Sequence, residues 1–90
     1  MTTCCVVGLG YIGLPTAAVL ARAGHRVIGV DVNAQVVGTV NEGRIHILEP
    51  DLDQAVSAAV SSGALSAQLS PGFADVFLIA VPTPFHSAID

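Results

Sequence analysis

The feature that most constrains this chain is a group of glycines between an apolar segment and a helical pattern. The group reads Gly8-Leu9-Gly10-Tyr11-Ile12-Gly13 and matches the pattern G-x-G-x-x-G. It follows the apolar residues 3–7, and Asp31 closes the next apolar run, close to the roughly 20-residue spacing of a ribose-binding acid. Together these features predict a β-α-β unit that binds a dinucleotide at the glycine turn.

Each glycine of the turn has its own expected task. We expect Gly8 to make the tight turn, Gly10 to let the backbone approach a pyrophosphate, and Gly13 to let helix and strand pack closely. The backbone N–H groups of Tyr11 and Ile12 should face the phosphates, because a helix N-terminus offers unpaired donors and a partial positive charge. Glycines that served packing alone would not explain the acid that follows them.

Asp31 bears on the choice between NAD and NADP. Its carboxylate would accept hydrogen bonds from the adenosine ribose hydroxyls and would repel a 2′-phosphate. The next two residues, Val32 and Asn33, offer no cation for that phosphate. The sequence therefore predicts NAD as the cofactor. The alternative for Asp31 is a helix-capping or solvated strand-end role.

Hydrophobic periodicity predicts four strands and three helices. Apolar runs predict strands over residues 3–7, 27–30 and 76–81, the last as a buried strand, and alternation predicts a half-exposed strand over 65–70. Helical spacing predicts helices over residues 12–23, 34–41 and 52–62. Pro15 fits a first helical turn, Gly24 a left-handed position after a helix, and Asn33 a helix cap.

The order of these elements predicts the fold class. Right-handed crossovers favour a parallel sheet of order 3-2-1-4, with the fourth strand beside the first where the order reverses. We expect a Rossmann-like α/β fold with three αβα layers, incomplete at its C-terminus, because residues 82–90 contain no closing element. Residues 1–90 are thus expected to be the N-terminal portion of an NAD-binding Rossmann domain, with the substrate domain absent.

A proline-flanked threonine follows the fourth predicted strand. The segment Val81-Pro82-Thr83-Pro84-Phe85 should lie next to the glycine turn, across the point where the strand order reverses. Its two prolines fix φ on both sides of Thr83 and hold the hydroxyl at low entropic cost. Position alone suits Thr83 equally to a cofactor contact or to a plain strand-end turn.

Composition and charge exclude several partners. The formal net charge is −4 with three Lys and Arg residues in all, so no basic patch can neutralise nucleic-acid phosphates. No apolar run reaches the roughly 18 residues that span a bilayer, and residues 1–3 lack the basic start of a signal peptide. We expect a cytoplasmic protein that binds neither nucleic acid nor membrane.

No metal site and no catalytic residue is predicted within these 90 residues. Cys4 and Cys5 are adjacent in a predicted strand, so their side chains should point to opposite faces as small buried apolar groups. The three histidines lie on separate predicted loops without metal-ligand spacing. No nucleophile with an adjacent base can be assembled from the sequence.

Four segments together resemble the UDP-glucose/GDP-mannose dehydrogenase family. They are Gly8-Leu9-Gly10-Tyr11-Ile12-Gly13-Leu14-Pro15, Asp31, His46-Ile47-Leu48-Glu49-Pro50 and Val81-Pro82-Thr83-Pro84-Phe85. The resemblance covers the whole chain and implies oxidation of a sugar C6 alcohol to a carboxylate with two NAD molecules, through a thiohemiacetal on a cysteine far downstream. It also implies cofactor contacts at Tyr11, Ile12, Asp31 and Thr83.

Two of these segments bear on the substrate. The H-I-x-E-P and V-P-T-P-F loops resemble members that act on UDP-N-acetyl-D-mannosamine more than members that act on UDP-glucose, whose loops more often read Y-E-P-G and V-G-T-P. The resemblance thus implies a UDP-sugar dehydrogenase of cell-surface polysaccharide synthesis, homodimeric at full length and inactive as these 90 residues alone. UDP-glucose 6-dehydrogenase is the alternative in this class, and a non-catalytic NAD-sensing module is the alternative from another.

Overall fold

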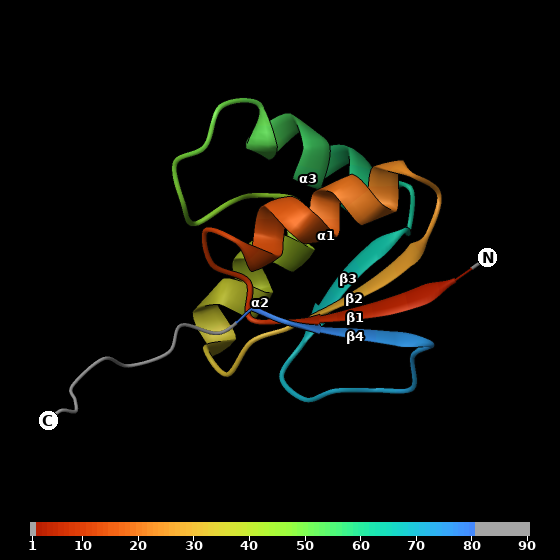
Figure 1. Cartoon of the computed structure of the whole chain (residues 1–90). Helices are drawn as coiled ribbons and strands as arrows, with labels where there is room; N and C mark the ends of the chain where they lie inside the picture. The colour runs from red at the N-terminus through yellow and green to blue at the C-terminus, as the bar shows by residue number, and fades with distance from the viewer. Residues whose placement is uncertain (1, 81–90) are drawn as a thin grey trace, which may run out of the picture.

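The sheet extends to both sides of the strand that precedes the glycine turn (Figure 1). The computed structural model describes residues 2–80. In chain order the elements are β1 (Thr3–Val7), α1 (Gly13–Arg22), β2 (Arg26–Val30), α2 (Ala34–Asn41), α3 (Leu52–Ser61), β3 (Leu65–Gln68) and β4 (Val76–Ile79). Strand β1 pairs in parallel with β2 and with β4, and β3 pairs in parallel with β2. The order β3-β2-β1-β4 confirms the predicted Rossmann-like sheet.

Local signals set the ends of the helices. Gly24 follows α1 with φ of 97°, and its N–H donates to the Ala21 carbonyl, while the N–H of His25 donates to the Leu20 carbonyl. This is the pairing of a Schellman cap, which needs a left-handed residue at the glycine position. At the start of α2, the Asn33 side chain accepts from the N–H of Gln35 at 2.9 Å. Both caps confirm the sequence prediction.

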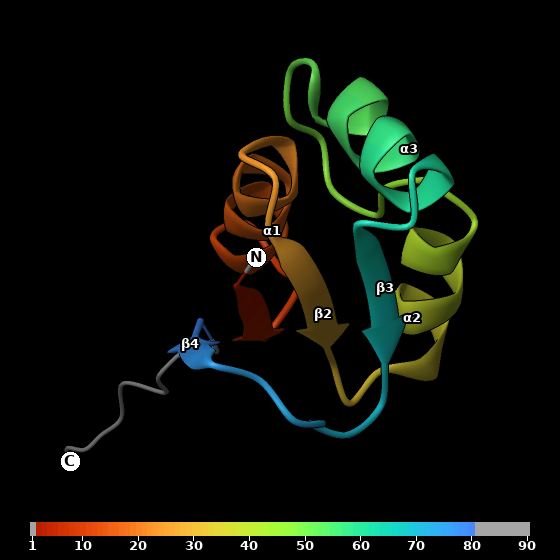
Figure 2. The same ribbon diagram turned by 90° about the vertical axis from the view of Figure 1, so that its right-hand side faces the viewer.

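One face of the sheet carries the core. The buried strand residues of the main cluster all project from that face, and they are Val6, Val27, Leu65 and Ala67. Each of the three helices adds residues to the same cluster, for example Leu14 of α1, Val40 of α2 and Val56 of α3. The views in Figures 1 and 2 show α1 and α3 on the same side of the sheet. Residues 2–80 therefore form two of the three predicted layers.

Helix α1 packs closely because its inner face is small. Ala17, Ala18 and Ala21 are buried there, as the spacing of small residues predicts. Across the fold, Asn41 at the end of α2 forms two hydrogen bonds with Ala67, accepting from its N–H at 2.8 Å and donating to its carbonyl at 2.9 Å. These bonds hold α2 against the outer strand β3.

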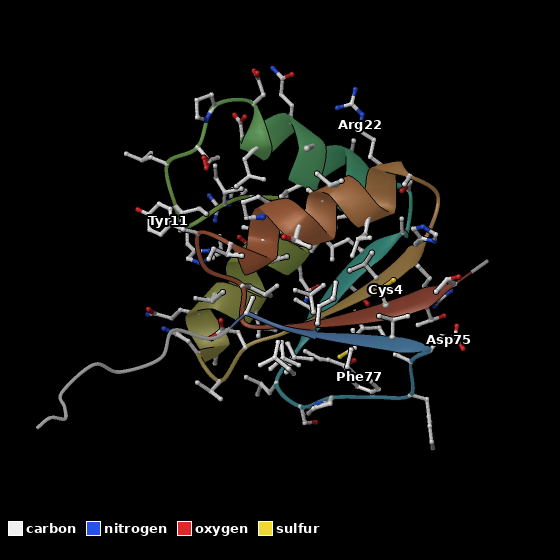
Figure 3. All side chains as sticks on the ribbon, in the orientation of Figure 1. Cys4, Tyr11, Arg22, Asp75 and Phe77 are labelled. Atoms are coloured by element: carbon white, nitrogen blue, oxygen red, sulfur yellow. The ribbon has the colours of Figure 1, made fainter. Side chains whose placement is uncertain are left out.

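The prediction of a buried fourth strand is wrong for this chain. All four residues of β4 are exposed, with Phe77 at 49% and Ile79 at 67% of their full accessibility. Strand β4 lies at the sheet edge beside β1, and Figure 3 shows Phe77 on the face away from α1. No helix of residues 2–80 covers that face. Val76 and Leu78 lie on the other face and are also exposed, at 42% and 36%, because no described strand lies beyond β4.

Two smaller expectations have mixed outcomes. The third strand ends at Gln68 rather than at residue 70. Beyond its end, Leu69 is exposed, and Gln68 Nε2 donates to the Ser70 carbonyl at 2.6 Å. Cys4 and Cys5 are buried free cysteines, as expected. Among the described helices, none is long and apolar enough to cross a membrane.

Candidate cofactor site

The glycine turn begins at the carboxyl end of β1. Gly8 has φ of 100°, in the left-handed region that favours glycine, and its N–H donates to the Val30 carbonyl of β2 at 2.7 Å. The chain thus turns sharply off β1 while staying bonded to the neighbouring strand. This is the tight turn expected of Gly8.

Gly13 lies directly against that turn. A Cβ on Gly13 would be 1.6 Å from the Gly8 carbonyl oxygen and 2.7 Å from the Gly8 carbonyl carbon. Both atoms are backbone, so no side-chain rotation could relieve the overlap. The first turn of α1 therefore needs glycine here, as the sequence predicts.

Gly10 is different, because among residues 2–80 no atom beyond its two chain neighbours lies within 4 Å of a Cβ built on it. The packing of the described residues gives no reason for a glycine at this position. A ligand that approaches the backbone at the turn would give one, and this is the role that the G-x-G-x-x-G pattern assigns to the second glycine.

The N-terminus of α1 is open to an anion. Its capping residue Ile12 makes no side-chain cap hydrogen bond, and the first turn contains no acidic residue. Tyr11 and Ile12 are exposed, and Figure 3 shows Tyr11 and Arg22 at opposite ends of α1. Phosphate binding here would depend on backbone N–H groups and the helix dipole rather than on an arginine of this helix.

Asp31 follows β2 and contacts the glycine turn. Its Oδ2 accepts from the N–H of Leu9 at 3.0 Å, and its Oδ1 accepts from the N–H of Asn33 at 3.0 Å. The carboxylate is half-buried and has acceptor capacity left, since two oxygens offer about four lone-pair sites. Asp31 therefore has a strand-end structural role and can still accept hydrogen bonds from ribose hydroxyls.

The structure brings six predicted site residues together at the carboxyl ends of β1 and β2, namely Gly8, Gly10, Tyr11, Ile12, Gly13 and Asp31. The seventh, Thr83, lies outside the described residues. The chain after β4 does reach the carboxyl end of β1, because the Ala80 N–H donates to the Val7 carbonyl at 2.7 Å. Within residues 2–80, no group of three or more His, Cys, Asp or Glu side chains could hold a metal ion.

Sequence reasoning missed two participants, Leu9 and Gly29. Leu9 occupies a variable position of the glycine pattern, yet it is fully buried and donates its N–H to Asp31. Gly29 lies inside β2, and a Cβ on it would be 2.9 Å from a methyl carbon of Leu9. A glycine within an apolar strand signals a close approach, so the signal was present in the sequence.

Three features define a dinucleotide-binding domain. They are a parallel sheet whose strand order reverses beside β1, a glycine turn that leads into a helix N-terminus without a side-chain cap, and an acid after the neighbouring strand. Residues 2–90 match the sequence model of the "UDP-glucose/GDP-mannose dehydrogenase family, NAD binding domain". The chain belongs to this family, and its cofactor is NAD.

Named relatives are similar over most of the chain. An NDP-N-acetyl-D-galactosaminuronic acid dehydrogenase of Ralstonia nicotianae is 66% identical over 92% of this chain, and a UDP-N-acetyl-D-mannosamine dehydrogenase of Yersinia pestis is 63% identical over 92%. The solved UDP-N-acetyl-mannosamine dehydrogenase of Staphylococcus aureus superimposes with a TM-score of 0.92 and 45% identity over 97% of the chain. The chain spans 20% of each of the first two proteins and 21% of the third.

Proposed function

We propose that residues 1–90 are the N-terminal, NAD-binding portion of a nucleotide-sugar 6-dehydrogenase that oxidises UDP-N-acetyl-D-mannosamine to UDP-N-acetyl-D-mannosaminuronate. The observation that carries this proposal is the glycine turn bonded to Asp31 in a chain of this dehydrogenase family. The names of the Yersinia pestis and Staphylococcus aureus relatives support the choice of substrate.

The proposed cofactor-binding residues are Gly8, Gly10, Tyr11, Ile12, Gly13, Asp31 and Thr83. The N–H groups at the start of α1 would bind the pyrophosphate, and the open space beside Gly10 would admit it. Asp31 would accept from the adenosine ribose hydroxyls while keeping its bonds to the turn. When bound, NAD supplies the acceptor for the hydride that leaves the sugar C6 carbon.

We further propose that the complete polypeptide is a cytoplasmic homodimer that acts in cell-surface polysaccharide synthesis. The family resemblance supports the dimer and the pathway, and a nucleotide-sugar substrate of that pathway supports the location. The exposed apolar side chains of β4, including Phe77 and Ile79, support further polypeptide packing at that edge of the sheet.

The complete polypeptide is expected to have a kcat/KM for UDP-N-acetyl-D-mannosamine at least about tenfold above that for UDP-glucose, because a site built for an N-acetyl group leaves buried polar groups unpaired without it. NADH formation measured with each sugar nucleotide tests this. The corresponding N-acetylgalactosamine nucleotide belongs in the same assay, because the Ralstonia nicotianae relative carries that sugar acid in its name. A higher kcat/KM for UDP-glucose would make UDP-glucose 6-dehydrogenase the better assignment.

The 90-residue chain alone is expected to form no NADH from any UDP-sugar. Its two cysteines are buried at 4% and 0% of their full accessibility, so neither can reach a substrate as a nucleophile. The assay compares the chain with the complete polypeptide at equal concentration. A complete polypeptide that binds NAD but oxidises no UDP-sugar would favour the NAD-sensing alternative, and activity in the short chain would contradict this prediction.

A further inference from the structure

Leu9 is an anchored residue inside an exposed turn. Its side chain is fully buried and belongs to the main hydrophobic core, whereas Tyr11 and Ile12 of the same turn are about 70% exposed. A Cβ on Gly29 would be 2.9 Å and 3.0 Å from the two Leu9 methyl carbons and 3.4 Å from Leu9 Cγ. Leu9 thus fills the space that a side chain at position 29 would occupy.

The glycine in β2 needs a reason, because glycine in a strand interior loses conformational entropy and packs no side chain. Gly29 lies between Val6 of β1 and Ala67 of β3 in the sheet register, at the centre of the buried face. The backbone angle φ at Gly29 is not positive, so a turn conformation does not explain it. The close approach of Leu9 does.

The same residue is held by a second contact with the β2 end of the sheet. The Leu9 N–H donates to Asp31 Oδ2 at 3.0 Å. Leu9 therefore has an apolar contact at Gly29 and a polar contact at Asp31, two residues further along the chain. Neither attachment touches the open side of the turn, where Gly10 has free space. The two contacts attach the turn to β2 at Gly29 and, just beyond the strand, to Asp31.

We propose that Leu9 and Gly29 are positioning residues for NAD, although neither contacts it. Their contact sets the distance between the phosphate-facing start of α1 and the ribose-facing carboxylate of Asp31. This inference rests on the proposed cofactor site. It adds that the packing beneath the turn, and not the glycine pattern alone, determines NAD affinity.

Gly29→Ala in the complete polypeptide is expected to raise the Kd for NAD by about three- to tenfold, because a displaced turn misaligns both ends of the dinucleotide. Calorimetric titration gives the Kd, and circular dichroism gives the melting temperature of the same sample. The KM for the UDP-sugar should stay unchanged, since the substitution acts through the cofactor turn. A merely structural role would lower the melting temperature and leave the Kd of the folded protein as it was.

A compensating variant sharpens the test. Leu9→Val removes one methylene, so the double variant Leu9→Val with Gly29→Ala conserves volume and should return the Kd to within about twofold of wild type. The matched control is Gly38→Ala in α2, where no described atom lies within 4 Å of the added Cβ, and its Kd should equal that of wild type. Leu9→Val alone should raise the Kd by about twofold or more, because it loosens the turn without a clash.

The outcomes separate this inference from the proposed function. Wild-type protein that binds no NAD would overturn both together. Wild-type binding with an unchanged Kd in Gly29→Ala would overturn the positioning role alone. Should Gly29→Ala fail to fold, an unchanged Kd in Leu9→Val would overturn it in the same way, and a raised Kd would support it.

Discussion

Replacing Gly13 with alanine is expected to lower both the stability and the NAD affinity of the complete polypeptide. The added Cβ would lie 1.6 Å from the Gly8 carbonyl oxygen, so either the turn or the first turn of α1 must move. Because both overlapping atoms are backbone and no side chain can move aside, we expect the free energy of unfolding to fall by about 3 kcal/mol or more. The same movement would displace the N–H groups proposed to face the phosphates, so we expect NAD affinity to fall by roughly tenfold or more, about 1.4 kcal/mol per factor of ten. Thermal melting and calorimetric titration measure the two effects.

Gly10→Ala is the matched comparison for Gly13→Ala. Its Cβ would meet no described atom within 4 Å, so the melting temperature should stay at the wild-type value. NAD affinity should still fall, because the Cβ would enter the space proposed for the pyrophosphate. A Gly10→Ala protein that binds NAD as tightly as wild type would contradict that placement. A Gly13→Ala protein with unchanged melting would contradict the close packing of helix on turn.

Much of the fold could be predicted because its signals are local. Gly24 and Asn33 marked helix ends by their own backbone and side-chain preferences, and the structure shows both in those roles. Strand β1 begins and ends where the apolar run does. The strand order followed from crossover handedness, which depends on chain chirality and not on distant contacts.

The burial of β4 could not be predicted in this way, because burial depends on what covers a strand. Phe77 and Ile79 are as apolar as the residues of β1, yet in residues 2–80 β4 is an edge strand that is exposed on both faces. Periodicity reports which side chains could be buried. It does not report whether a second layer is present to bury them.

The sequence predicted which residues form the candidate site, but not the packing contacts beneath the glycine turn. The glycine pattern located the turn and Asp31, whereas the Leu9 side chain was treated as a free position between two glycines. Its contact with Gly29 joins the turn to β2, and helix α1 separates these two segments in the sequence. The two roles predicted for Asp31 do not exclude each other, because a carboxylate that accepts from the Leu9 and Asn33 N–H groups has acceptor capacity left for a ribose hydroxyl.

Asp31→Ala is expected to reduce NAD affinity by roughly tenfold or more while NADP binding weakens less or improves. Charge-assisted hydrogen bonds to ribose hydroxyls are each worth about 1.5 to 3 kcal/mol, and about 1.4 kcal/mol corresponds to a factor of ten. The substitution also removes the charge that repels a 2′-phosphate. Because Asp31 accepts from the Leu9 N–H, part of the NAD loss comes from a loosened turn. That part acts on both cofactors, so the NAD to NADP affinity ratio isolates the ribose contact.

Two variants make the ratio decisive. Asp31→Asn keeps the size and one acceptor oxygen but loses the charge, so it should shift the ratio toward NADP with less loss of turn structure. Asp75→Ala is the control at the opposite end of β1, where the Asp75 carboxylate accepts from the Thr3 N–H at 2.9 Å, far from the glycine turn (Figure 3). It should leave the ratio unchanged. If Asp31→Ala and Asp31→Asn, both folded by circular dichroism, also keep the wild-type ratio, Asp31 acts only on the turn and cofactor choice is determined elsewhere.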